Sequence, residues 1–194
     1  MPLGEAIAIT LQVTQVLERL GIEYLVGGSL ASSLLGIPRA TLDVDLVAVL
    51  APEHVEPLVQ ALAPTFYIDE AAVADAIRRR ASFNIIHLET VFKVDVFVQK
   101  DQPLARSEMS RKQTYELSDR PGVRLVVGSA EDIILQKLDW YRLGHEISER
   151  QWTDVLGVFK VQGDRLDLTY LRHWAAQVGL SALLERALGT LRPR

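Results

Sequence analysis

Two aspartates interrupt an apolar stretch of this sequence, and this pattern constrains the fold more than any other feature. The stretch LDVDLVAVL, residues 42–50, has the branched apolar composition of a buried strand. Because side chains of a strand alternate between its two faces, Asp43 and Asp45 lie on one face and their neighbours lie on the other. Two such close carboxylates repel each other unless a cation intervenes. The pattern therefore predicts a strand with one core face and one cation-binding face.

A third carboxylate lies in a second apolar strand. Asp95 belongs to the stretch VFKVDVFV, and an apolar stretch that reads SFNIIHL precedes it. A two-residue turn at Glu89 and Thr90 would pair Asn84 with Asp95, so that both side chains lie on one face. Lys93 lies in the same row as Asp95. The sequence therefore predicts a hairpin that presents a carboxylate beside an amide and an ammonium.

Asp43, Asp45 and Asp95 form a candidate catalytic metal site. Their donors are all oxygens, and no His or Cys ligand accompanies them, which favours Mg²⁺ or Mn²⁺ over zinc. The competing interpretation is that each aspartate lies at a strand end or on a solvated face, as a single strand aspartate usually does. Three carboxylates in two apolar strands favour the metal site.

The triplet Gly27–Gly28–Ser29 lies between a predicted strand and a predicted helix. Glycines let a backbone approach a phosphate closely, a helix N-terminus attracts anions, and the Ser29 hydroxyl can cap the helix or donate to a phosphate. The spacing matches neither the P-loop nor the dinucleotide-binding fingerprint. Together with the carboxylates, the triplet predicts a nucleoside triphosphate that lies across both. Arg39 precedes the carboxylates and is a further phosphate ligand candidate.

The rest of the chain predicts an α+β fold with a mixed sheet flanked by helices. A core is expected over residues 1–128 and a C-terminal helical part, packed on that core, over residues 129–194. Strands are expected at 22–26, 42–50, 83–88, 91–98, 111–117 and 123–128, with a turn at Pro121 and Gly122. Helices are expected at 5–20, 30–36, 52–63 and 70–80, and in four segments after residue 129. Ser129 and Asp132 have the spacing of a capping box.

Composition narrows the class of protein. The net charge of −4 argues against broad non-specific DNA binding, which needs a basic surface. The absence of cysteine excludes disulfides, thiol catalysis and cysteine zinc sites. No apolar stretch is long enough to span a bilayer, and the first residues lack the pattern of a signal peptide, so we expect a cytoplasmic protein.

These motifs resemble the DNA polymerase β-like nucleotidyltransferase superfamily. The resemblance is carried by GGSLASSLLGIPRATLDVDLV and FNIIHLETVFKVDVFV, and more loosely by SAEDIILQKLDWY and ERQWTDVLGVF. Small bacterial and archaeal members are similar, including toxins of the AbiEii type in toxin–antitoxin pairs. The resemblance implies a Mg²⁺-dependent transfer of a nucleotide from an NTP such as ATP to a hydroxyl acceptor, with pyrophosphate release.

The resemblance also implies roles for single residues. Gly28 and Ser29 would hold the triphosphate, and Asp43 and Asp45 would coordinate two Mg²⁺ ions. Asp95 would complete the metal site and orient or deprotonate the attacking hydroxyl. Two residues of the C-terminal half would join them: Lys137 would approach the phosphates, and Asp154 is a weaker candidate at the wall of the cleft. The implied acceptors are an RNA or tRNA end, a protein side chain or a small molecule, and the toxin-type relatives imply an antitoxin partner.

Several alternatives remain open. The chain can be a non-catalytic relative that binds a nucleotide or a partner protein. A phosphohydrolase of the haloacid dehalogenase type also uses Asp-x-Asp, but its pair lies where the strand ends, whereas LVAVL continues the strand here.

Single residues also have alternative interpretations. Arg39 can be solvated, Lys137 can lie on the surface, and Asp154 can pair with Arg150 one helical turn away. The tryptophans Trp140, Trp152 and Trp174 are interpreted as helix-packing residues.

Overall fold

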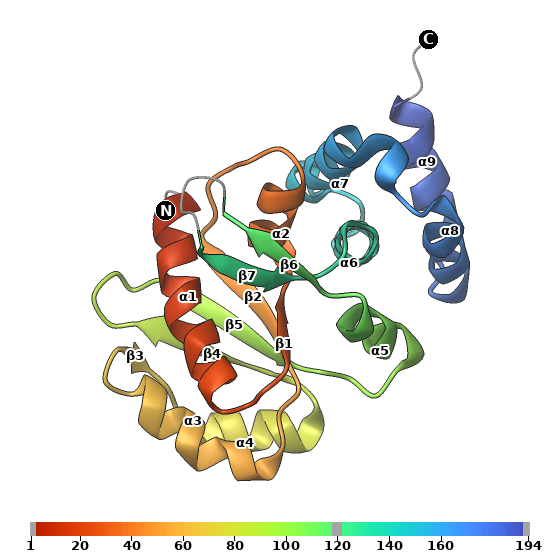
Figure 1. Ribbon diagram of the computed structural model, residues 1–194. Coiled ribbons are helices and arrows are strands. Elements are labelled where there is room, and N and C mark those ends of the chain that lie inside the picture. Colours follow the sequence, from red (N-terminus) through yellow and green to blue (C-terminus); the bar gives the residue numbers. More distant parts are fainter. Residues whose placement is uncertain (1–2, 118–121, 192–194) are drawn as a thin grey trace.

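A single mixed sheet organises the fold in the computed structural model, which describes residues 3–117 and 122–191. Within these residues, seven strands lie in the order β3-β4-β5-β2-β1-β7-β6 (Figure 1). The strands are β1 (Tyr24–Val26), β2 (Asp43–Ala48), β3 (Phe66–Tyr67), β4 (Ser82–His87), β5 (Lys93–Val98), β6 (Gln113–Glu116) and β7 (Arg124–Val127).

Helices flank this sheet, so the predicted α+β class is confirmed. They are α1 (Leu3–Arg19), α2 (Gly28–Leu35), α3 (Val55–Leu62), α4 (Glu70–Arg79), α5 (Pro103–Ser110), α6 (Ala130–Leu143), α7 (Glu149–Gln162), α8 (Leu168–Gln177) and α9 (Ser181–Leu191), with 3₁₀ turns at Pro52–His54 and Gly163–Arg165. The sequence did not predict β3 or α5. The predicted turn residue Pro121 lies outside the described residues.

The predicted hairpin has the expected register. Asn84 pairs with Asp95 across β4 and β5, which run antiparallel. The connection is longer than the predicted two-residue turn, because β4 ends at His87 and the Val91 amide donates to the His87 carbonyl at 2.9 Å. On its other side β5 runs parallel to β2, and β2 runs antiparallel to β1. The two carboxylate-bearing strands are therefore neighbours near the centre of the sheet.

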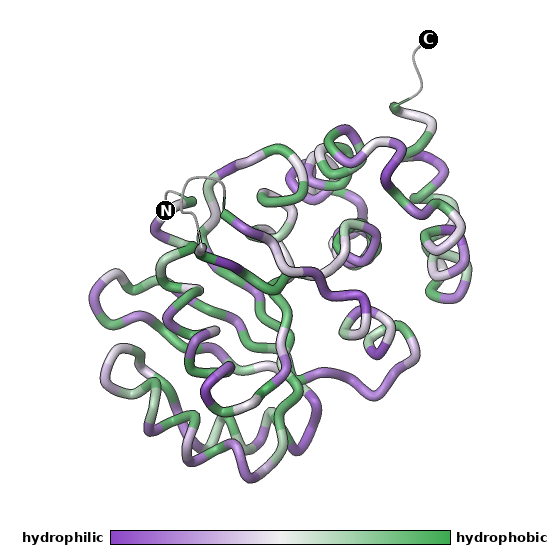
Figure 2. The backbone as a smooth tube through the Cα atoms, in the orientation of Figure 1, coloured by the Kyte–Doolittle hydropathy of each residue, from purple (hydrophilic) through white to green (hydrophobic). Residues whose placement is uncertain are grey.

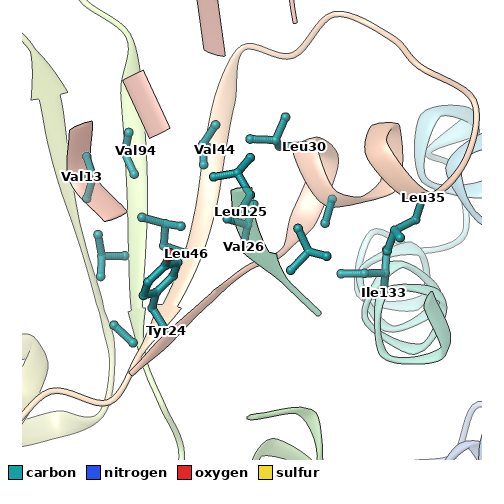
Figure 3. Close-up of a cluster of buried hydrophobic side chains, with 14 of the residues drawn as sticks. Val13, Tyr24, Val26, Leu30, Leu35, Val44, Leu46, Val94, Leu125 and Ile133 are labelled. Carbon is teal, nitrogen blue, oxygen red and sulfur yellow. The ribbon is translucent and has the colours of Figure 1, made fainter. Parts of the chain in front are cut away.

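One face of β2 belongs to the core, as the alternation predicted. Val44, Leu46 and Ala48 are fully buried, and so is Val94 on β5. Figure 3 shows Val44, Leu46 and Val94 in a cluster with Val13 of α1. Hydrophobic residues likewise follow the central strands in Figure 2, whereas the helices alternate between hydrophobic and hydrophilic residues. Burial of these branched side chains fixes which face of β2 presents the aspartates.

The opposite face of the sheet is partly covered by α6. The Phe97 ring of β5 contacts the Trp140 ring of α6, with their centroids 6.5 Å apart. Helix α7 packs on α2 closely: a Cβ atom added at Gly36 would lie 2.8 Å from the Val158 nitrogen. This close packing places α6 and α7 beside the carboxylate face. Among residues 3–117 and 122–191, no helix is both long and apolar enough to cross a membrane.

Candidate active site

The three predicted aspartates lie on one face of neighbouring strands. Asp45 is directly opposite Asp95, and Asp43 is directly opposite Lys93, in the parallel pair of β2 and β5. Their exposure differs: the Asp43 side chain is 40% exposed, the Asp95 side chain is 18% exposed, and Asp45 is buried. The sheet therefore brings the carboxylates together, with Asp43 at the open end of the row.

Lys93 supplies a cation within this row. Its Nζ atom lies 2.7 Å from Oδ2 of Asp95 and 4.0 Å from Oδ2 of Asp43. The hydrogen bond to Asp95 raises the pKa of Lys93, and the nearby Asp43 and Asp45 charges add to this effect. The Lys93 ammonium thus offsets part of the repulsion that the sequence predicted.

The donor chemistry fits a hard divalent cation, but the present arrangement is not a closed metal cage. The three carboxylates offer only oxygen atoms, which Mg²⁺ and Mn²⁺ prefer. Within the described part of the chain, however, no group of three or more His, Cys, Asp or Glu residues is gathered closely enough to hold a metal ion. The Lys93 ammonium bonds to Asp95 instead. Metal binding by all three aspartates therefore requires this ion pair to open.

Asp45 holds its proton more tightly than an exposed aspartate does. Burial and the neighbouring Asp43 charge raise its pKa to about 6. The Lys137 charge and a hydrogen bond from the Ser29 backbone act in the opposite direction. A bound divalent cation would favour the charged form of Asp45 far more strongly than these groups do.

Only glycine fits between α2 and Asp45. Gly28 has a φ of +55°, and a Cβ atom at this position would lie 1.7 Å from Oδ2 of Asp45. The Gly27 amide donates to the Asp45 carbonyl at 2.9 Å, which fastens the turn to β2. The Gly28 amide donates to Oε1 of Gln136 on α6, also at 2.9 Å. The Gly27 and Gly28 amides are therefore both hydrogen-bonded within the protein.

Ser29 has a different local role from the predicted one. Helix α2 begins at Gly28 with Gly27 as its N-cap, so Ser29 lies inside the first turn and does not cap the helix. Its hydroxyl oxygen instead accepts hydrogen bonds from the Arg39 guanidinium at 2.8 Å and from Nζ of Lys137 at 3.2 Å. Ser29 therefore lies where α2, the following loop and α6 meet.

Asp154 of α7 holds both of these cations. It accepts two hydrogen bonds from Arg39, each of 2.7 Å, and its Oδ2 atom lies 2.8 Å from Nζ of Lys137. Asp154 does not pair with Arg150. Lys137 is fully buried, so the interpretation as a surface lysine is wrong. Gln136 was missed as a site residue because its one signal is its position beside Lys137.

The charges of this network depend on each other. Burial lowers the pKa of Lys137, and the Asp154 carboxylate counteracts that effect. Burial would raise the pKa of Asp154, but the hydrogen bonds from Arg39 and Lys137 outweigh it and lower the pKa. The hydrogen bond to Asp154 also raises the pKa of Arg39. Asp154 is thus the counter-ion that allows a fully buried lysine to remain charged.

No family model and no curated protein sequence matches this chain. Solved structures do match. A nucleotidyltransferase-like protein from Paracoccidioides brasiliensis has a TM-score of 0.56 at 18% identity, with 95% of this chain and 93% of that chain covered. The antibiotic-resistance factor ANT(2'')-Ia has a TM-score of 0.53 at 12% identity, with 95% and 94% covered. It has also been solved with adenylyl-2''-tobramycin.

A third match is LnuA, a lincosamide antibiotic adenylyltransferase solved with lincomycin bound. Its TM-score is 0.50 at 13% identity, with 77% of this chain and 93% of that chain covered. Sequence identities this low establish the fold alone. The chain has the fold of the nucleotidyltransferases, as its resemblance to the DNA polymerase β-like superfamily predicted.

Proposed function

We propose that this protein is a Mg²⁺-dependent nucleotidyltransferase. It transfers a nucleoside monophosphate from an NTP, with ATP as the first candidate, to a hydroxyl acceptor and releases pyrophosphate. The observation that carries the proposal is the close approach of Gly28 to Asp45, with Asp95 in register beside them. A glycine turn in contact with a row of carboxylates is suited to a triphosphate and the cation that accompanies it.

Asp43, Asp45 and Asp95 would hold the metal. When bound, Mg²⁺ would neutralise the phosphates and stabilise the attacking and departing oxygens. The exposed Asp43 carboxylate faces the open end of the row and is the one most accessible to an incoming metal–nucleotide complex. Lys93 would leave Asp95 as the divalent cation replaces its charge, and would then be available to a phosphate oxygen.

The transfer would be an in-line substitution at the α-phosphorus. The acceptor oxygen forms a bond to this phosphorus while the bond to the bridging oxygen of the β-phosphate breaks, and pyrophosphate leaves with that oxygen. Asp95, freed from Lys93, accepts the hydroxyl proton. The protein contributes placement and charge rather than covalent chemistry, which is the usual division in nucleotide transfer.

Ser29, Arg39 and Lys137 would serve the triphosphate side of the site. Arg39, whose side chain is 25% exposed, can reach a phosphate while it keeps one contact with Asp154. Lys137 is fully buried, so its role is to position the Ser29 hydroxyl and to direct positive potential toward Asp45. Asp154 fixes both cations and is a positioning residue.

Several classes of hydroxyl acceptor are compatible with this transfer. LnuA and ANT(2'')-Ia, which share the fold, were solved with small-molecule antibiotics or their adenylylated products, and this supports a small-molecule acceptor. An RNA or tRNA end or a protein hydroxyl, and a toxin that has an antitoxin partner, are the other candidates from the resemblance. A non-catalytic role is favoured by one observation, the ion pair of Lys93 with Asp95.

We expect Asp95→Asn to abolish transfer, because the amide cannot accept the proton of the attacking hydroxyl. The assay combines purified protein, Mg²⁺, α-labelled ATP and a cell extract, and measures label on any acceptor. Asp101→Asn is the matched control, because this aspartate pairs with Arg106 on the surface outside the carboxylate row. Labelling by Asp95→Asn at the level of Asp101→Asn contradicts the proposed site, as does full labelling by Asp43→Asn.

Gly28→Ala tests the contact between α2 and Asp45. We expect it to abolish transfer and to weaken Mg²⁺–ATP binding, because the new methyl group displaces the Asp45 carboxylate. Gly21→Ala is the control: Gly21 has a similar φ of +68°, but nothing lies within 4 Å of its added Cβ atom. Both variants carry the backbone cost of positive φ, about 1 kcal/mol. Equal losses of binding in both would show that backbone strain alone explains the effect.

Asp154→Asn tests the buried network. We expect it to lower the free energy of unfolding by about 3–5 kcal/mol, because it leaves the Lys137 charge buried without its counter-ion. Adding Lys137→Met should restore part of this loss, since the second change removes that charge. Urea denaturation measures both effects, with Asp75→Asn, which breaks a surface ion pair, as a control that leaves stability unchanged. An Asp154→Asn variant as stable as this control would refute the assigned role.

A further inference from the structure

A cavity adjoins the carboxylate row on the same face of the sheet. Its volume is about 560 Å³, and Val47 of β2 and Phe97 of β5 form part of its lining. These two residues follow Asp45 and Asp95 by two positions, so they lie in the same rows, roughly 7 Å further along each strand. The cavity therefore begins directly beside the reacting groups.

The cavity has the size and the lining of a small-molecule site. Trp140 of α6 and Leu104 of α5 contribute to its walls, with Leu180 before α9. Ligand pockets typically enclose about 300–1,000 Å³ and combine apolar walls with a few polar groups. Trp140, interpreted from the sequence as a helix-packing residue, thus also lines the cavity.

Glu108 of α5 is an acid in this lining whose carboxyl group lacks a partner in the described part of the chain. It is partly buried, and its carboxyl group has no hydrogen bond or ion pair with any residue of the described ranges. Burial and, to a lesser extent, the Asp132 charge raise the pKa of Glu108 to about 8. Glu108 also lies in the last turn of α5, where a negative charge is unfavourable. The chain therefore keeps a carboxyl group where it costs stability.

The other charged groups of the lining are already satisfied or solvated. Asp139 pairs with Arg142, and Arg142 also donates to the Val178 carbonyl at 2.8 Å. Arg80 donates to the Gln99 carbonyl and is exposed, as is Lys100. The unmatched group inside the cavity is therefore an acid, and a cation bound beside it would lower its pKa and favour its ionised form.

Gln136 connects the cavity to the glycine turn. Its side chain lines the cavity, and its Oε1 atom accepts the hydrogen bond from the Gly28 amide. A molecule in the cavity would thus lie against the same amide side chain that holds the proposed triphosphate turn. This arrangement suits a second substrate that must meet the nucleotide.

We propose that this cavity is the acceptor pocket and that it selects hydroxyl compounds which carry a protonated amine beside an apolar ring. The ring would lie against Phe97 and Trp140, the ammonium would bind Glu108, and the hydroxyl would point along the strands toward Asp95. The assignment as an acceptor pocket rests on the proposed nucleotidyl transfer. The selection of a cationic ring compound rests on the cavity alone.

Three probes that differ in one group test this selection. They are 2-amino-1-phenylethanol, 1-phenyl-1,2-ethanediol and mandelate, which share the ring and the hydroxyl and carry an ammonium, a neutral hydroxyl and a carboxylate, respectively. Binding to the full chain without nucleotide is measured by NMR titration at pH 7.5, and the shifted resonances report the location. We expect the amine to bind at least about tenfold more tightly than the diol, with shifts at Phe97 and Trp140. Equal binding of the three probes, or tightest binding of mandelate, would overturn the proposal.

Glu108→Gln separates a ligand role from a structural one. We expect this variant to lose the tenfold preference for the amine and to bind the diol as the wild type does, while Glu53→Gln, at an exposed helix position, changes neither. The variant should also be at least as stable as the wild type. The folded state holds the Glu108 proton more tightly than the unfolded state, so the wild type loses stability as the pH rises from about 5 to 8. The stability advantage of Glu108→Gln over the wild type should therefore grow over this range. An unchanged amine preference in Glu108→Gln overturns the proposal.

A binding assay for Mg²⁺–ATP keeps this inference distinct from the proposed function. Glu108→Gln should bind Mg²⁺–ATP within twofold of the wild type. If Mg²⁺–ATP binds and the amine preference is absent, the acceptor pocket is wrong and the nucleotidyl transfer stands. If the amine preference is present and Mg²⁺–ATP does not bind, the cavity binds amines but is not an acceptor pocket, and the proposed transfer fails.

Discussion

Repulsion among Asp43, Asp45 and Asp95 is the constraint on which the site depends. The parallel pairing of β2 with β5 places all three on one face, and the core residues on the other face fix that orientation. The protein offsets the repulsion with Lys93, which bonds to Asp95. The carboxylate row is costly without a cation, and it is suited to a divalent cation that arrives with a nucleotide.

A network of charged side chains in the helical part supports the carboxylate row. Asp154 of α7 holds Arg39 and Lys137, and both of these contact the Ser29 hydroxyl at the start of α2. Breaking such a buried network is costly, so it fixes the position of α2 relative to the sheet. The close approach of Gly28 to Asp45 follows from that position. The C-terminal helices thus contribute to the site although the carboxylates lie on strands.

Local patterns in the sequence predicted the parts of this structure that depend on near neighbours. Alternation in β2 and a short turn before β5 were sufficient to place the aspartates on one face and to pair Asn84 with Asp95. Long-range contacts decided the rest. The burial of Lys137 depends on Ser29, which is 108 residues away, and no local pattern encodes that contact. The strand β3 was missed because it has only two residues, and α5 was missed because its stretch PLARSEMS has no apolar stripe and buries only Met109. Helix α5 carries the one unpaired acid of the cavity.

In the proposed function, the carboxylate row and the glycine turn together hold a metal–nucleotide complex. A crystal structure with Mn²⁺ and a non-hydrolysable ATP analogue tests it most directly, because the anomalous signal locates the metal. We predict Mn²⁺ bound to Asp43 and Asp45, the triphosphate beside Gly28 and Ser29, and Lys93 displaced from Asp95. Mn²⁺ bound elsewhere, or a nucleotide bound with the Lys93–Asp95 ion pair intact and no metal on the aspartates, would contradict it.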